Sequence, residues 1–200
     1  MIYFLLGFNI VKKYNLFVHI NNPLYALPEK MTEKVKIYTY PDPILRSISK
    51  PVENIDENTH KLIDSMAETM YAAPGIGLAA VQVGEPIRLI VYDVTSGEGK
   101  RNPQVLINPE IILAEDSIVY AEACLSVVDY SADVERSSRI KVKGLDRNGN
   151  PLDIEAEDLE AVCLQHEIDH LNGILFIDHI SSLKRSIYKR KLKKMMEKEA

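Results

Sequence analysis

The segment His166-Glu167-Ile168-Asp169-His170 limits the possible folds more than any other part of this sequence. Side chains four residues apart lie on the same face of a helix, so the two imidazoles can bind one metal ion. Glu167 stands beside the first of them, where it can accept a proton from an attacking water. We therefore expect a helix that begins near Asp158, with Asp158 as its N-cap, and ends at Asn172-Gly173. For this motif alone, a helix that carries two histidines by chance is the alternative.

The two cysteines of the sequence decide what kind of metal site this helix can form. A catalytic metal usually has three protein ligands and one open position. Cys163 lies three residues before His166 and Cys124 lies far upstream, and either thiolate can supply a third ligand. If both bind, the site is closed and structural; if only one binds, the site stays open for hydrolysis. The spacing of these residues does not distinguish the two arrangements.

Segments that predict strands are concentrated in the middle of the chain, with helical segments at both ends. Apolar residues have helical spacing over 56–73, and a last helix begins near Ser182 with Leu183, Ile187, Leu192 and Met195 on one side. Strands are predicted over 87–94, 105–108, 110–113, 117–126, 139–145 and 152–156. This order predicts an α+β fold, with small mixed or antiparallel sheets packed around the central metal-binding helix and a C-terminal helix.

Charge is distributed unevenly along the chain. Residues 181–200 contain eight Lys or Arg and two acidic residues, whereas the whole chain has a formal net charge of −5. A basic tail on an acidic body indicates a polyanionic partner for the tail. A solvated helical face without a partner is the alternative, and composition alone favours it slightly.

Three segments resemble, in identity and in order, the motifs of one enzyme family. Residues 75–84 read GIGLAAVQVG, residues 122–126 read EACLS, and residues 165–173 read QHEIDHLNG. They resemble the GxGLAAxQ, EGCLS and QHExDHLxG motifs of peptide deformylases, and the similarity extends over about residues 35–180. Three motifs in one order are far more specific than any one of them.

The resemblance implies a reaction and its machinery. The reaction is metal-dependent hydrolysis of the N-formyl group from the formylmethionine of nascent polypeptides, with release of formate. Glu167 would move the proton, as base and then as acid, while the Gln82 amide and the Leu125 backbone N–H would stabilise the oxyanion. The cofactor would be one Fe²⁺ per chain, which Zn²⁺, Ni²⁺ or Co²⁺ can replace. The implied metal ligands are Cys124, His166 and His170.

The resemblance also implies how the peptide is held. Strand-like backbone near Ile76 and Ala123 would pair with it as an added strand. Gly75 and Gly77 would let the backbone pass close to the substrate. The apolar pocket for the methionine side chain would be lined by Ile76, Leu159, Val162 and Cys163.

Several charged residues near these motifs have expected supporting roles. Glu122 and Arg136 resemble a family ion pair that braces the cysteine loop. Asp169 would either orient a ligand histidine or face solvent. The remaining histidines are expected to be structural or surface residues; they are His19, His60 and His179.

The chain departs from the family pattern at three positions. Ala123 replaces the usual glycine before the cysteine, Val128 stands where many relatives have proline, and Ser131 stands where some have arginine. These changes put efficiency and peptide preference in doubt, but not the metal chemistry. The alternatives are an HExxH peptidase that cleaves internal bonds, and a non-enzymatic Cys₂His₂ zinc-stabilised binding protein. The first lacks a downstream third ligand, and the second leaves Glu167 and Gln82 unexplained.

The motifs suggest three regions. Residues 1–30 form an N-terminal extension, and we expect that translation begins at Met31 and that the native protein lacks this extension; a short membrane-surface or organelle-targeting segment is the alternative. Residues 31–180 form the catalytic domain, and residues 181–200 form a basic helix that we expect to bind the ribosome near the exit tunnel. We expect a cytoplasmic protein without a membrane span or a DNA partner.

Overall fold

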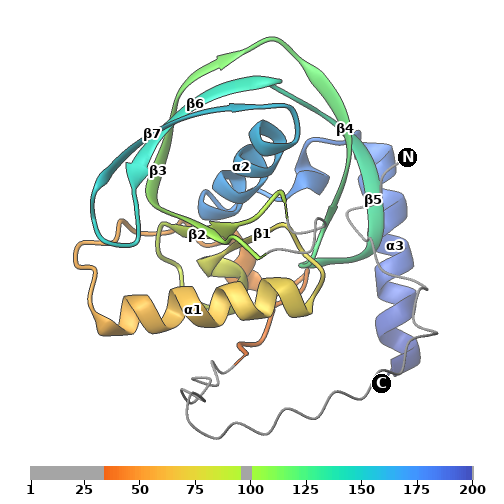
Figure 1. The fold of residues 1–200 in the computed structure, drawn as a ribbon. Helices are drawn as coiled ribbons and strands as arrows, with labels where there is room; N and C mark the ends of the chain where they lie inside the picture. Colours follow the sequence, from red (N-terminus) through yellow and green to blue (C-terminus); the bar gives the residue numbers. More distant parts are fainter. Residues whose placement is uncertain (1–33, 96–100, 200) are drawn as a thin grey trace, which may run out of the picture.

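The computed structural model describes residues 34–95 and 101–199, in which two antiparallel sheets enclose a central helix (Figure 1). One sheet has five strands in the order β1-β2-β3-β6-β7, and the other is the β4–β5 hairpin. The predicted α+β fold is therefore confirmed. The helices and strands are α1 (Glu57–Ala72), β1 (Gly77–Ala79), β2 (Leu89–Tyr92), β3 (Gln104–Glu115), β4 (Ile118–Cys124), β5 (Val127–Arg136), β6 (Arg139–Leu145), β7 (Pro151–Glu157), α2 (Asp158–Leu171) and α3 (Ser182–Glu199).

The core lies between α2 and the five-stranded sheet. Leu164 and Ile168 of α2 pack in one buried cluster with Ile90, Leu106 and Val142 from three different strands. α1 covers another part of the sheet through Ile63, Met66 and Met70, as its helical spacing predicted. Both helices thus bury an apolar stripe against the sheet, and α2 lies in the middle of the molecule (Figure 1).

The strand predictions need two corrections. The predicted strands at 105–108 and 110–113 are one strand, β3, because a shift in register between Ile107 and Glu110 accommodates Pro109, which cannot donate a backbone hydrogen bond. β1 and β5 were not predicted. β1 has only three residues, and β5 carries polar residues within its apolar pattern, so the alternation that identifies a strand is weak in both.

The backbone at the two ends of α2 shows where the helix begins and where it stops. Asp158 is its first helical residue, with φ of 48°, and the N-cap position belongs to Glu157, so the prediction that Asp158 is the N-cap is wrong. The reason is that the Asp158 N–H donates to the Ser138 carbonyl, so the chain passes directly from β7 into the helix. The predicted end is confirmed, because Gly173 adopts φ of 70° after the C-cap Asn172.

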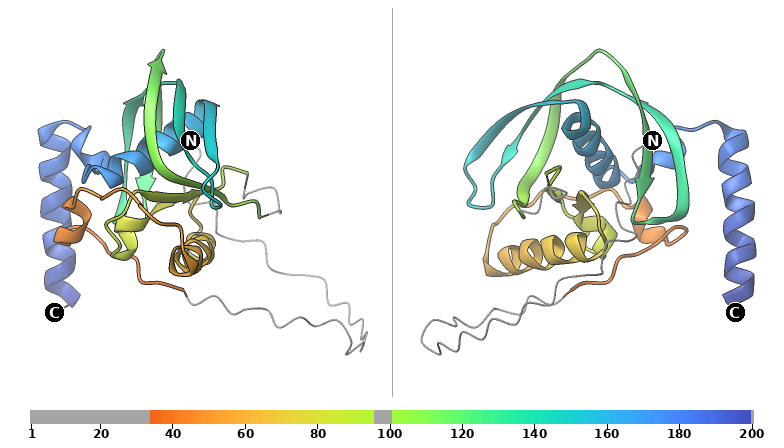
Figure 2. Two further views of the ribbon diagram at one scale, coloured as in Figure 1. Left: turned by 90° about the vertical axis from the view of Figure 1, so that its left-hand side faces the viewer. Right: turned by 45° about the vertical axis from the view of Figure 1, so that its right-hand side comes forward.

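α3 stands at the outer edge of the molecule, beside β5 (Figure 2). Tyr188 and Leu192 are its buried residues, and the Tyr188 ring stacks on Tyr130 at 4.5 Å between centroids. The predicted apolar side is therefore only partly correct, since Leu183 and Ile187 are 66% and 51% exposed. Contact with aromatic rings of the body selects the face of α3 that is buried, and hydropathy does not reveal that choice.

Within the described ranges, no helix is long and apolar enough to cross a membrane. The predicted N-terminal extension, residues 1–30, lies outside the residues that the structure describes.

Candidate metal centre

The end of β4 and the middle of α2 bring three potential metal ligands together. Ligand atoms of Cys124, His166 and His170 all lie within 4.8 Å of one another, and the Cys124 sulfur is 3.1 Å from Nε2 of His170. Cys163 does not join them: it is buried, and its thiol is 3.7 Å from the Ile76 carbonyl oxygen. Thiolate and imidazole donors suit divalent zinc, iron and nickel. The geometry thus fits an open site with three protein ligands.

A buried carboxylate orients the first histidine. The side chain of Glu122 is fully buried and accepts from His166 Nδ1 at 2.8 Å and from Arg136 Nε at 2.7 Å. Burial alone would raise the pKa of Glu122, but the hydrogen bonds from His166 and Arg136 outweigh it and hold this pKa at about 2. An ionised carboxylate only accepts, so Nδ1 of His166 carries the proton. In the neutral tautomer that this bond selects, Nε2 carries the lone pair that can bind a metal.

The chain of contacts continues from Arg136 to the surface. Arg136 Nη1 donates to Asp169 at 2.6 Å, and the same Asp169 oxygen is 2.7 Å from His179 Nε2. Asp169 therefore neither contacts a ligand histidine directly nor simply faces solvent, the two roles that we considered. It holds Arg136, which in turn holds Glu122. Sequence reasoning missed the part of His179, because nothing in the sequence relates it to Asp169 or to Arg136.

Glu167 follows the ligand His166 in α2 and is buried. Burial raises the pKa of Glu167 to about 7, and its Oε2 has no hydrogen-bond partner among the described residues. A carboxylate with a free buried oxygen and a pKa near neutrality is suited to accept and return a proton. Gly77 makes room for this carboxylate, since a Cβ at that position would collide with the Glu167 side chain.

Gln82 reaches the same place from the short helical turn Ala80–Val83. Its Oε1 accepts from the Ala79 N–H at 2.7 Å, which turns its NH₂ group toward Cys124 (3.7 Å) and Ser126 (3.1 Å). The amide is thus held as a donor facing the ligand cluster. Ser126, which is fully buried, was not among the predicted site residues, although it is the serine of the Cys-Leu-Ser motif.

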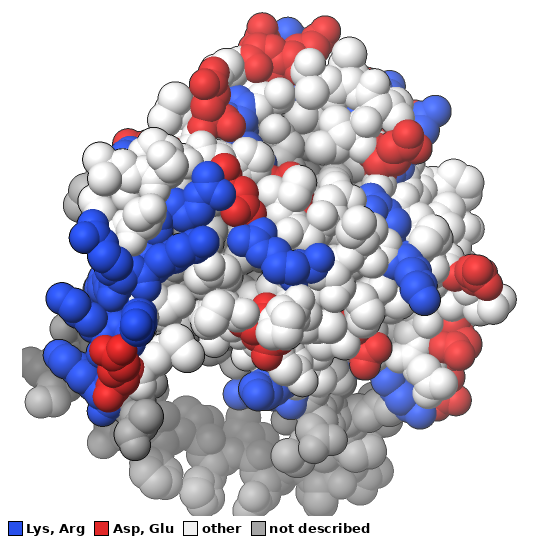
Figure 3. Space-filling view, turned by 180° about the vertical axis from the view of Figure 1, so that it is seen from behind, with Lys and Arg blue, Asp and Glu red and all other residues white. Residues whose placement is uncertain are grey.

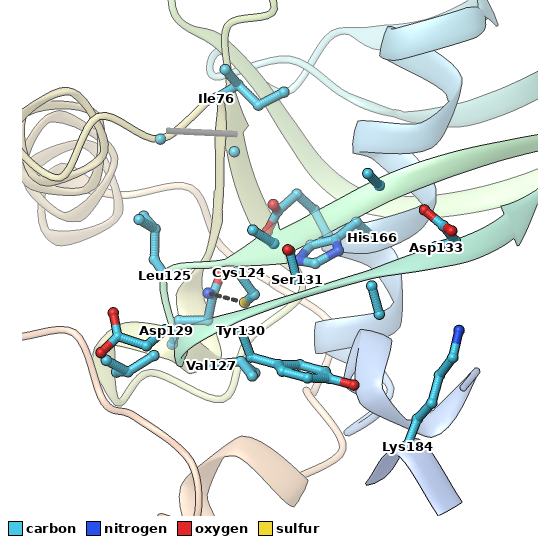
Figure 4. A pocket seen from close by; sticks show the side chains of 18 residues that line it. Ile76, Cys124, Leu125, Val127, Asp129, Tyr130, Ser131, Asp133, His166 and Lys184 are labelled. Atoms are coloured by element: carbon cyan, nitrogen blue, oxygen red, sulfur yellow. Dashed lines mark hydrogen bonds between the residues drawn. The ribbon is translucent and has the colours of Figure 1, made fainter. Parts of the chain in front are cut away.

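A cavity of about 850 Å³ opens beside these groups (Figure 4). It lies between β1 and β4, each of which is an edge strand in its sheet. Four predicted peptide-binding residues line it, as does Leu125, whereas Leu159, Val162 and Cys163 do not. The four are Gly75, Ile76, Gly77 and Ala123.

The site defines a class of protein. Two histidines and a glutamate on a central helix, a cysteine from an edge strand and an adjacent cavity are the parts of a metallohydrolase. Residues 34–186 match the family model described as polypeptide deformylase. The chain belongs to this family, and it is a metal-dependent enzyme that removes the N-formyl group from nascent peptides.

Curated relatives and solved structures agree with this assignment. The peptide deformylase of Mesorhizobium japonicum is 56% identical over 161 residues, 80% of this chain and 92% of that protein. That of Bartonella henselae is 55% identical over 155 residues, 77% of this chain and 88% of that protein. A crystal structure of a peptide deformylase from Legionella pneumophila has a TM-score of 0.78 and 46% identity, covering 83% of this chain and 97% of that one.

The departure at Ala123 has a structural explanation. Ala123 pairs with Ser131 in the β4–β5 hairpin, and it is not among the residues with positive φ. A methyl group is tolerated in ordinary strand backbone, so glycine is not needed there.

Proposed function

We propose that Cys124, His166 and His170 hold one divalent cation, Fe²⁺ in the cell, and that Glu167 moves the proton of the reaction. The observation that carries this proposal is the convergence of three ligand atoms within 4.8 Å beside a buried carboxylate with a free oxygen. When bound, the cation supplies Lewis-acid activation of water and of the formyl carbonyl. Zn²⁺, Ni²⁺ or Co²⁺ can take its place.

The chain's own residues account for the remaining steps. Glu167 accepts a proton from the water that attacks the formyl carbon, and then delivers it to the amine that leaves. The Gln82 amide and the Leu125 backbone N–H donate to the oxyanion that forms at the formyl oxygen. The peptide pairs with the free edges of β1 and β4 near Ile76 and Ala123. We also propose that the methionine side chain binds in a pocket formed by Ile76, Leu159, Val162 and Cys163.

The role of Gln82 is tested by Gln82→Leu. We expect this substitution to lower kcat for a formyl-methionyl peptide by on the order of 10²-fold, because one oxyanion donor is lost. Metal content should be unchanged, since Gln82 is not a ligand. Ser126→Ala is the matched control: it removes only the hydroxyl that accepts a hydrogen bond from the amide, and it should have a smaller effect. Equal kcat in wild type and Gln82→Leu would exclude Gln82 as a donor. The measurement is formate release by protein loaded with Fe²⁺ or Ni²⁺ without oxygen.

We further propose that the basic residues of α3 bind ribosomal RNA near the exit tunnel, in the cytoplasm. Figure 3 shows Lys and Arg side chains gathered over α3 at one edge of the molecule. Their partner would be the phosphates of an RNA surface.

We also propose that residues 1–30 are an extension outside the catalytic domain. The intact mass of the native protein reports whether they are present.

The ribosome proposal predicts a charge effect that leaves the fold intact. Replacing the exposed Lys189, Lys193 and Lys194 with glutamine should weaken ribosome co-sedimentation and make it less dependent on salt, because fewer counterions are released. The matched control replaces Lys50, Lys61 and Lys143, which are exposed elsewhere. Deleting the helix is a poorer test, because Tyr188 packs against the body. Equal co-sedimentation of both triple variants would overturn the proposal.

A further inference from the structure

His179 stands at the boundary between solvent and the buried charges behind the ligand His166. The exposed fraction of the side chain is 36% for His179 and 18% for Asp169. It falls to 5% for Arg136 and to 0% for Glu122, which contacts His166. His179 is therefore the outermost member of a series of contacts that ends at a metal ligand, and the proposed reaction steps make no use of it.

Two donors meet at one oxygen of Asp169. Nη1 of Arg136 donates to Oδ2 of Asp169 at 2.6 Å, and Nε2 of His179 is 2.7 Å from the same oxygen. Because a carboxylate paired with arginine only accepts, Nε2 of His179 carries a proton and donates the hydrogen bond. The 3.4 Å contact between Nε2 and Nη1 then joins two donors, so it is not a hydrogen bond. His179 thus acts on Arg136 through Asp169, whose carboxylate it holds in place.

The short helical turn Phe176–Asp178 fixes the position of His179. The His179 N–H donates to the Phe176 carbonyl at 3.1 Å. Phe176 is buried, and its ring stacks on that of His166 with 6.1 Å between the centroids. One turn of the chain therefore contacts the ligand His166 directly through Phe176, and it contacts the charges behind this ligand through His179.

A small polar cavity of about 340 Å³ lies on the outer side of these charges. It is lined by Arg136 and His179 together with Asp116, Ser117, Glu135, Ser137 and Gln165. The two acidic residues have partners of their own, since Asp116 pairs with Arg139 and Glu135 accepts from Ser117. Removing the His179 imidazole would enlarge this cavity toward Asp169. Water would then compete with Arg136 for that carboxylate and screen the ion pair.

We propose that His179 is a positioning residue for the metal ligand His166, and that it acts through Asp169, Arg136 and Glu122. The inference rests on the proposed metal ligands, and it adds a residue that raises their affinity for the cation. The inner contacts are short: Glu122 accepts from Arg136 at 2.7 Å and from His166 at 2.8 Å. A group that bonds a ligand histidine directly changes metal affinity by about 10- to 100-fold. The effect of His179 is smaller, about threefold to tenfold, because its bond to Asp169 is partly exposed.

The test measures the Kd for Ni²⁺ by competition between the full chain and a chelator. His179→Leu should raise this Kd about threefold to tenfold, because Asp169 loses a donor. His179→Gln should restore most of the affinity, since its amide N–H can donate in place of Nε2. The free energy of unfolding of the metal-free protein should change little in both variants, because the side chain is 36% exposed. His60→Leu is the matched control: it makes the same change in α1 and should keep the wild-type Kd.

A double-mutant cycle with Asp169→Asn separates this role from a general loss of packing. In the Asp169→Asn background, His179→Leu should cause no further change in the Kd for Ni²⁺. The inference is overturned if the full effect of His179→Leu persists in that background, if His179→Leu alone keeps the wild-type Kd, or if His179→Gln binds Ni²⁺ as weakly as His179→Leu. A wild-type chain that binds no Ni²⁺ would instead overturn the proposed ligands, and the inference with them.

Discussion

Replacing Glu167 with glutamine or alanine lowers formate release from a formyl-methionyl peptide by about 10²–10⁴-fold, the range typical of a lost general base. The reason is geometric. Glu167 has a free buried oxygen beside Cys124, His166 and His170, whereas the other carboxylates that line the cavity, Asp129 and Asp133, are exposed. The metal content should stay at that of the wild type, because the ligands are unchanged.

Glu160→Gln is the matched control. It makes the same chemical change earlier in the same helix, where Glu160 accepts a hydrogen bond from the Tyr92 hydroxyl. It should retain wild-type turnover. Glu167→Gln with wild-type turnover would remove Glu167 from the mechanism.

The pH dependence of kcat/KM follows from the environment of Glu167. Burial raises the pKa of this carboxyl group to about 7, and a nearby bound cation lowers it from that value because it favours the charged form. The ionised form is the base, so activity falls as pH falls through this pKa. We expect the acidic limb of the pH profile at or below pH 7. An acidic limb clearly above pH 7 would assign the titration to another group.

The second large effect is expected for Arg136→Met. This substitution leaves Glu122, which is fully buried, without its guanidinium partner. Breaking a buried ion pair on one side costs about 3–5 kcal/mol, because the remaining charge is uncompensated. Since Glu122 also orients His166 at 2.8 Å, metal affinity should fall about 10- to 100-fold. The measurements are denaturant unfolding and metal titration.

Two comparisons isolate the buried pair. Arg139→Met changes a nearby arginine whose pairs with Glu115 and Asp116 are exposed, so its effect should stay within about 1 kcal/mol. The double variant Arg136→Met with Glu122→Gln should recover part of the stability, because no uncompensated charge remains. It should not recover metal affinity, since the carboxylate that orients His166 is gone. If Arg136→Met is no more harmful than Arg139→Met, the bracing role is wrong.

Much of the site was predictable because its signals are local. Helix geometry alone places His166 and His170 on one face with Glu167 beside them, and Gly173 ends that helix by adopting positive φ. The resemblance to peptide deformylases separated the roles of Cys124 and Cys163, which spacing had left open, and the ligand cluster in the structure contains Cys124.

Other features were not predictable because they depend on contacts between distant parts of the chain. The alternation of β5 is interrupted by polar residues, and only its pairing with β4 defines it as a strand. The buried face of α3 depends on the ring of Tyr130, so hydropathy indicated Leu183 and Ile187 instead of Tyr188.

The sequence by itself determined the class of chemistry: a helix with two histidines and a glutamate, two cysteines, and motifs whose order identifies the family. These signals can be recognised without a structure, because they depend on residue identity and on helical geometry within a few residues. Only the tertiary structure decided how Arg136 links Glu122 to Asp169, and that Lys184 of the basic helix lines the cavity. The physical reason is that such contacts arise when separate elements pack together, and spacing along the chain carries no record of that packing.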